Sequence, residues 1–145
     1  MKSKAKTTIR VEHDAQRLHR FLKDHDYPFT WEPAKLQKYC IMLRIEEDRR
    51  VVAYTWGNWT DDGVLDFHAC AERRLWLTPA VLERLHLTCE LFGASMMTTR
   101  PHGDTAPAIR RLLTRAGFKE TPDGLLYKDL GDDNGYVLKQ QAEDL

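Results

Sequence analysis

The chain has 145 residues, 42% of them hydrophobic, which is enough for one domain with a substantial core. Its 22 basic and 22 acidic residues cancel, which excludes a chain-wide attraction to nucleic acid or to an anionic membrane. No apolar run approaches the roughly 20 residues that cross a bilayer, and no apolar segment follows the basic N-terminus as in a signal peptide. The cysteines Cys40, Cys70 and Cys89 are odd in number and lie in predicted strands and helices. They therefore indicate reduced thiols and a cytoplasmic protein.

The first third of the chain predicts a strand, a helix and an aromatic loop. Residues 7–12 alternate β-branched and polar side chains, which is typical of a strand. Asp14 can cap the helix that follows, where apolar residues recur at spacings of three and four. Two prolines exclude a regular helix over residues 27–33 and predict an ordered loop with three aromatic side chains. A short helical turn is expected at residues 34–38.

The middle of the chain predicts an antiparallel meander of three strands at residues 39–46, 51–60 and Val64–Ala71. The sequence Asp-Asp-Gly between the last two strands is a turn signal. Alternation in the second strand places Tyr54 on one face and Val51 on the other, beside Ala53. The aromatic residues of this region either fill the core or form an acceptor wall or a protein-binding patch. They are Phe29, Trp31, Tyr54, Trp56 and Trp59.

The last third predicts two helices that alternate with strands. Thr78 and Pro79 form a helix start signal, because a hydroxyl can cap the first turn and proline is tolerated at its first position. Glycines follow both predicted helices, as expected at helix ends. The elements are a helix at 79–93, a strand at 95–100, a helix at 105–117 and a hairpin around 122–124.

The second of these helices ends in the sequence Arg-Ala-Gly-Phe at residues 115–118, and a Pro-Asp-Gly hairpin follows it. In this order of elements, that ending resembles the GNAT superfamily of CoA-dependent N-acetyltransferases. The resemblance implies a single α+β domain at residues 1–130, with a flexible acidic tail at 131–145. It also implies a mixed, mostly antiparallel sheet, flanked by helices, that splays open between the strands at Val64–Ala71 and 95–100.

The resemblance further implies acetyl-CoA, or another acyl-CoA, as the cofactor between the splayed strands. In that family the pyrophosphate rests on backbone N–H groups where the next helix begins. The family's glycine-rich phosphate loop corresponds here to a stretch in which Trp76 and Thr78 replace glycines. The family's proton-donating tyrosine corresponds to Leu113, which cannot donate a proton. The residues implied in cofactor binding are Arg73, Arg74, Leu75, Trp76, Leu77, Thr78 and Thr105.

Two residues of one predicted strand region are candidates for the general base that deprotonates an amine. Glu72 ends the region, and His68 has an ordinary pKa of about 6.5, which suits proton transfer. His68 can instead be a structural residue with a backbone partner. A zinc site of His68 and Cys70 with His86 and Cys89 is a further alternative. It is disfavoured because structural zinc ligands usually lie closer in sequence, so no metal is expected.

Two functions are consistent with these residues. The first is an N-acyltransferase that moves an acetyl group from acetyl-CoA to a small-molecule or protein amine. The second takes account of the replaced glycines and tyrosine: a catalytically inactive, GNAT-like phage protein that binds a host protein or takes part in virion assembly, in the host cytoplasm. Arg73 and Arg74 could hold a pyrophosphate in the first case or an acidic partner in the second. Neither function predicts a nucleic-acid or membrane partner.

Overall fold

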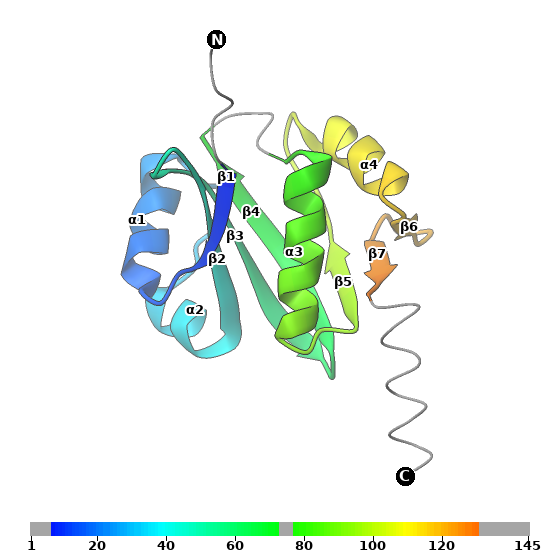
Figure 1. Cartoon of the computed structure of the whole chain (residues 1–145), viewed down its shortest axis with the longest axis horizontal. Helices are drawn as coiled ribbons and strands as arrows, with labels where there is room; N and C mark the ends of the chain where they lie inside the picture. The colour runs from blue at the N-terminus through cyan, green and yellow to red at the C-terminus, as the bar shows by residue number, and fades with distance from the viewer. Residues whose placement is uncertain (1–6, 73–76, 131–145) are drawn as a thin grey trace.

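The computed structural model describes residues 7–72 and 77–130, which form one sheet flanked by helices (Figure 1). The elements in chain order are β1 (Thr7–Val11), α1 (Ala15–Asp24), α2 (Pro33–Tyr39), β2 (Cys40–Glu47), β3 (Arg50–Asp61), β4 (Val64–Ala71), α3 (Pro79–Leu91), β5 (Met96–Thr99), α4 (Ala106–Arg115), β6 (Lys119–Glu120) and β7 (Leu126–Asp129).

The sheet has the strand order β1-β2-β3-β4-β5-β7-β6. Within the described residues, β4 and β5 are the one parallel pair, and the other neighbours are antiparallel. A parallel pair needs a long crossover connection, which α3 provides. The predicted α+β fold with a mixed, mostly antiparallel sheet is therefore confirmed.

Helices cover both faces of this sheet, and each face has its own core (Figure 1). On the α1/α2 face, the fully buried Trp56 packs in a cluster with Leu18 and Leu36. On the α3/α4 face, Leu65 and Phe67 of β4 pack in a cluster with side chains from α3 and α4. Alternation along β4 therefore places its odd-numbered residues toward α3 and α4, and His68 and Cys70 toward α1 and α2.

The helices α1 and α3 begin where the sequence predicts. The Asp14 side chain accepts a hydrogen bond from the Gln16 N–H at 3.0 Å, and the Thr78 hydroxyl accepts one from the Val81 N–H at 3.2 Å. The short turn expected at 34–38 is α2, and it includes Tyr39, which the sequence assigned to the next strand. Among the described residues, no helix has the length and apolar character needed to span a membrane.

A β-bulge changes one predicted strand face. The register of β2 against β3 shifts between Ile45 and Glu46, so that Ala53 and Val51 are opposite consecutive residues of β2. The extra residue, Val52, lies in the α3/α4 core, whereas Val51 packs against the α1/α2 core. The prediction that Val51 shares a face with Ala53 is wrong, because one inserted residue reverses the alternation.

Gly57 of β3 lies directly opposite Phe67 of β4 and is buried. A Cβ added at Gly57 would come within 2.9 Å of the Phe67 ring. We expect Gly57→Ala to lower the free energy of unfolding by about 1–3 kcal/mol, because a buried ring must move. Urea denaturation measures this effect. Thr60→Ala, at an exposed position of the same strand, is the control and is expected to stay within about 0.5 kcal/mol. Equal stability of the two variants would contradict the prediction.

Candidate active site

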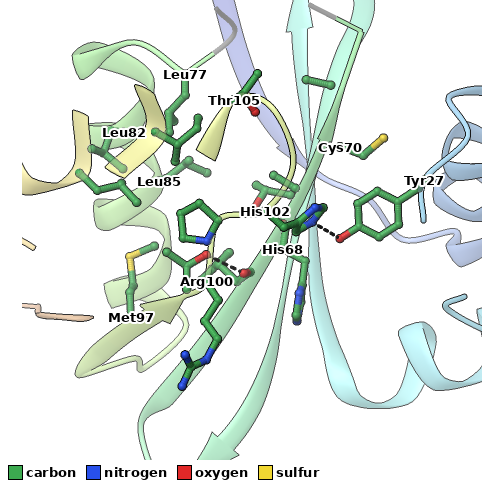
Figure 2. Close-up of a pocket in the computed structure, with 18 of the residues that line it drawn as sticks. Tyr27, His68, Cys70, Leu77, Leu82, Leu85, Met97, Arg100, His102 and Thr105 are labelled. Carbon is green, nitrogen blue, oxygen red and sulfur yellow. Dashed lines mark hydrogen bonds between the residues drawn. The ribbon is translucent and has the colours of Figure 1, made fainter. Parts of the chain in front are cut away.

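The strands β4 and β5 pair only along part of their length. Their register runs from Val64 opposite Met96 to Phe67 opposite Thr99. Beyond this point β4 continues to Ala71, whereas the chain has left β5. A cavity of about 360 Å³ opens between the diverging segments, and it is lined from both faces of the sheet (Figure 2). The splay predicted between these two strands is therefore present.

The two ends of the cavity differ in chemistry. Figure 2 shows the leucines and Met97 on one side of β4, and Tyr27 and Cys70 on the other. The side chains that line the apolar end include Leu77, Leu82, Leu85, Met97, Ile109 and Leu113. Those that line the polar end include His25, Tyr27, His68, Cys70 and His102. A ligand in this cavity could therefore place an apolar arm on the α3/α4 side and a polar reactant on the α1/α2 side.

The β4 backbone from Ala69 to Ala71 borders the cavity between these two ends. Its pairing with β5 stops at Phe67, so N–H groups on this edge are not paired to β5. Fixed backbone donors of this kind can stabilise an oxygen that gains negative charge during a reaction. The divergence of the strands thus creates both the space and the donors.

His68 lines the polar end and is held by three neighbours. Its Nε2 lies 3.0 Å from Asn58 Oδ1 and 3.4 Å from Asp66 Oδ2, and its ring centroid lies 4.7 Å from that of Trp31. Asp66 is itself fixed by the Thr98 hydroxyl, which donates to it at 2.7 Å. Both neighbours of Nε2 are oxygen acceptors, so the proton of a neutral His68 is assigned to Nε2. Nδ1 is then the nitrogen that can accept a proton.

The surroundings of His68 keep its imidazole neutral. Burial lowers its pKa from the ordinary value near 6.5, the nearby Asp66 raises it in part, and His102 lowers it. Because the net direction is downward, His68 is unprotonated at neutral pH and has a free lone pair. This is the state that a general base requires.

Glu72, the other candidate base, also lines the cavity and is partly exposed. Its carboxylate forms an ion pair with Arg50, and its backbone N–H donates to the Val52 carbonyl at 2.9 Å. The ion pair fixes the Glu72 side chain near the end of β4. The structure therefore brings both predicted bases to one cavity, where Glu72 is engaged by Arg50 and His68 keeps Nδ1 outside its contacts with Asn58 and Asp66.

The residues predicted to bind the cofactor fall into three groups. Leu77 and Thr105 line the cavity, and Thr105 makes no capping hydrogen bond to α4. Thr78 does not line the cavity, and its hydroxyl caps α3. Pro79 has no N–H, the Val81 and Leu82 N–H groups bond to Thr78, and the Ala80 N–H makes no hydrogen bond to another described residue. The remaining four lie outside the described residues: Arg73, Arg74, Leu75 and Trp76.

Leu113 lies where the resemblance would place a proton-donating tyrosine. It is 4% exposed, it lines the apolar end of the cavity, and it packs in the α3/α4 core. The position therefore faces the cavity as expected but carries no acidic proton. Three residues of the polar end were not predicted: His25, at the end of α1, Tyr27, from the loop after α1, and His102, from the loop after β5. Tyr27 belongs to the aromatic loop that the prolines indicated, whereas His102 has no distinguishing sequence pattern.

The zinc alternative is excluded by the two faces of the sheet. Cys70 packs in the α1/α2 core and Cys89 in the α3/α4 core. His86 lies near Phe118 and Lys128, away from His68. Among the residues that the structure describes, no group of three or more potential ligands could hold a metal ion.

Comparison with known proteins gives likeness in structure but not in sequence. No protein-family model matches the chain, and no curated protein matches it. Among solved structures, the chain is similar to the ribosomal-protein-S18-alanine N-acetyltransferase of Escherichia coli, with a TM-score of 0.63 and 15% identity over 86% of this chain and 94% of that one. It is also similar to the spermidine N-acetyltransferase of Vibrio cholerae, with a TM-score of 0.67 and 9% identity over 86% and 94%.

A third similar structure contains a ligand. It is yncA of Salmonella typhimurium, assigned as an acetyltransferase and solved with its cofactor acetyl-CoA, with a TM-score of 0.61 and 16% identity over 87% of this chain and 95% of that one. Identities this low establish the arrangement of the backbone and not the activity. The TM-scores of 0.61 to 0.67 over 86–87% of this chain show that it shares its fold with these neighbours. The chain has the fold of the GNAT N-acetyltransferases.

Proposed function

We propose that this protein is an N-acyltransferase that moves an acetyl group from acetyl-CoA to an amine in the cavity between β4 and β5. One observation carries the proposal: the splay of this fold places an apolar lining, unpaired backbone donors and a neutral, half-buried imidazole around one cavity. Acyl transfer to an amine needs a site for the donor chain, donors for the carbonyl oxygen and a base for the amine.

The residues of the apolar end fit the donor. When bound, acetyl-CoA supplies a thioester whose acyl carbon an amine can attack. Leucines of α3 and Met97 would flank its pantetheine arm, and the Thr105 hydroxyl is available as a polar contact. The Ala80 N–H at the positive end of α3 would contact the pyrophosphate, and Arg73 and Arg74 are proposed to supply its countercharge.

The residues of the polar end act on the amine. His68 Nδ1 would take a proton from the bound ammonium, either directly or through one water, while Asn58 and Asp66 hold Nε2 in place. The unpaired N–H groups of β4 would stabilise charge on the acyl oxygen. Glu72 would attract a cationic acceptor toward the cavity and is the second candidate for the base.

Acetyl-CoA binding is the first test of this function. We expect saturable binding in calorimetry, and a ligand at 100 times its Kd should stabilise the fold by roughly 2.7 kcal/mol in thermal unfolding. Arg73→Ala should weaken binding about 10-fold, because a charge-assisted contact to phosphate is lost. Arg111→Ala, which removes an exposed arginine of α4, is the matched control and should leave the Kd unchanged. No stabilisation at millimolar acetyl-CoA would overturn the proposal.

The second hypothesis predicts that acetyl-CoA does not bind or stabilise the protein. It is a phage-type protein without catalytic activity that binds a host or virion protein, and its basis is the loss of glycines at Trp76 and Thr78. No contact among the described residues specifies such a partner. It is therefore retained only as the interpretation that failure of acetyl-CoA binding would favour.

A further inference from the structure

Acyl transfer from a thioester leaves a sulfur anion that needs a proton. Leu113 occupies the position at which the resemblance implies a proton-donating tyrosine. Another group must therefore protonate the sulfur if the proposed function holds. Among the described residues that line the cavity, Tyr27 is the one phenol. It enters from the loop after α1, on the opposite face of the sheet from Leu113.

The backbone and the packing together direct the Tyr27 side chain into the cavity. Asp26 adopts a positive φ of 51°, which turns the chain back so that the Tyr27 N–H donates to the Leu22 carbonyl at 3.0 Å. The Tyr27 ring then packs edge-on against the buried Trp56, with centroids 5.3 Å apart. A ring fixed on one side by Trp56 has little freedom, so its hydroxyl is held at one place.

That place is a contact with His102. The Tyr27 hydroxyl lies 3.3 Å from His102 Nε2, and Figure 2 shows this hydrogen bond as a dashed line. The two residues are 75 positions apart in sequence, and they come from the loops after α1 and after β5. Both line the cavity, so their hydrogen bond lies at its polar end. His102 is exposed, so it can exchange protons with water. The pair therefore connects the cavity to solvent.

The phenol also holds its proton in this setting. Burial raises the pKa of Tyr27 to about 12, and Cys70 contributes to the increase. At neutral pH Tyr27 therefore keeps its hydroxyl proton until the reaction and can donate it then. Cys70 also lines the cavity, but its thiol has no hydrogen-bond partner among the described residues that could fix or replenish its proton.

We propose that Tyr27 is the catalytic acid of the acyl transfer, with His102 as its positioning residue. As the amine nitrogen bonds to the acyl carbon, the carbon–sulfur bond breaks and its electron pair goes to sulfur. The Tyr27 O–H proton passes to that sulfur, and the phenolate regains a proton from water through His102. The proposal rests on the proposed function, since it names the source of a proton that only this reaction requires.

Binding of two cofactor analogues tests the proposal without turnover. If the Tyr27 hydroxyl contacts the sulfur, the protein should bind CoA about 10-fold more tightly than desulfo-CoA, which lacks the sulfur atom. This is the difference that one charge-assisted hydrogen bond gives. In Tyr27→Phe the two analogues should bind equally. Tyr39→Phe, at an exposed tyrosine in α2 away from the cavity, is the matched control and should keep the difference. Equal binding of both analogues to the wild type would overturn the proposal.

Turnover supplies the second readout. Tyr27→Phe should lower kcat by about 10²-fold with little change in KM, because general acid catalysis is lost while the cavity is preserved. His102→Ala should lower kcat by a smaller factor. Leu113→Tyr, which restores a phenol on α4, should recover part of the rate of Tyr27→Phe. An unchanged kcat in Tyr27→Phe, or a larger loss in Cys70→Ala, would overturn the acid assignment while leaving acyl transfer established. If the wild type binds no acetyl-CoA, the proposed function itself has failed.

Discussion

Replacing His68 with alanine is expected to lower kcat for acyl transfer by about 10²–10⁴-fold, the range for loss of a general base. The reason is that Nδ1 is the free proton acceptor of an imidazole whose other nitrogen is held by Asn58 and Asp66. Steady-state kinetics with acetyl-CoA and an amine measure the effect. His13→Ala, at an exposed position before α1, is the matched control and should retain the wild-type rate.

Two further readouts separate catalysis by His68 from a structural role. Added imidazole should restore part of the rate of His68→Ala, which a packing defect would not allow. In the wild type, kcat should fall as the pH drops through the pKa of His68, because protonation removes the lone pair. Since burial lowers that pKa, the fall should occur below the ordinary value near 6.5. A His68→Ala enzyme with unchanged kcat would move the role of base to Glu72.

The largest loss of stability is expected from Glu12, a buried carboxylate between β1 and α1. It accepts hydrogen bonds from the Tyr54 hydroxyl at 2.6 Å, from Arg44 Nη1 at 3.3 Å and from the Asp14 N–H at 3.4 Å. Glu12→Ala would leave a buried phenol without its acceptor and a guanidinium without one of its two carboxylates. We expect the free energy of unfolding to fall by about 3 kcal/mol, as measured by urea denaturation.

Matched variants separate the network from the loss of one side chain. Glu90→Ala, at an exposed position of α3, should change stability by less than about 0.5 kcal/mol. Tyr54→Phe removes only one donor and should cost less than Glu12→Ala, because Arg44 then keeps its partner. If Glu12→Ala were as stable as Glu90→Ala, the buried hydrogen bonds would not contribute as described.

Local patterns in the sequence were sufficient to predict most of the fold. Asp14 and Thr78 cap helices because their short oxygen side chains can reach N–H groups two or three residues ahead. The alternation of β4 correctly placed His68 and Cys70 on one face. The bulge at Val52 could not be predicted, because it depends on how β2 and β3 meet and leaves no mark in either strand alone.

The site was predicted only as far as one strand and its immediate neighbours. His68 and Glu72 both line the cavity because β4 carries the first and ends one residue before the second. Asn58 contacts His68, and Tyr27 contacts His102. Asn58 and Tyr27 come from elements other than β4, so these contacts depend on the tertiary fold. The zinc hypothesis failed for the same reason, since spacing within an element does not show which face of the sheet the next helix covers.

Product formation tests the central claim most directly. A mixture of small amines and short peptides with free N-termini would be incubated with acetyl-CoA and the protein, and then analysed by mass spectrometry and by release of free thiol. We expect at least one acetylated amine, formed in a one-to-one ratio with free CoA and lost in His68→Ala. Release of thiol without an acetylated product, or no product from a protein that also binds no acetyl-CoA, would contradict an acyl-transfer site between β4 and β5.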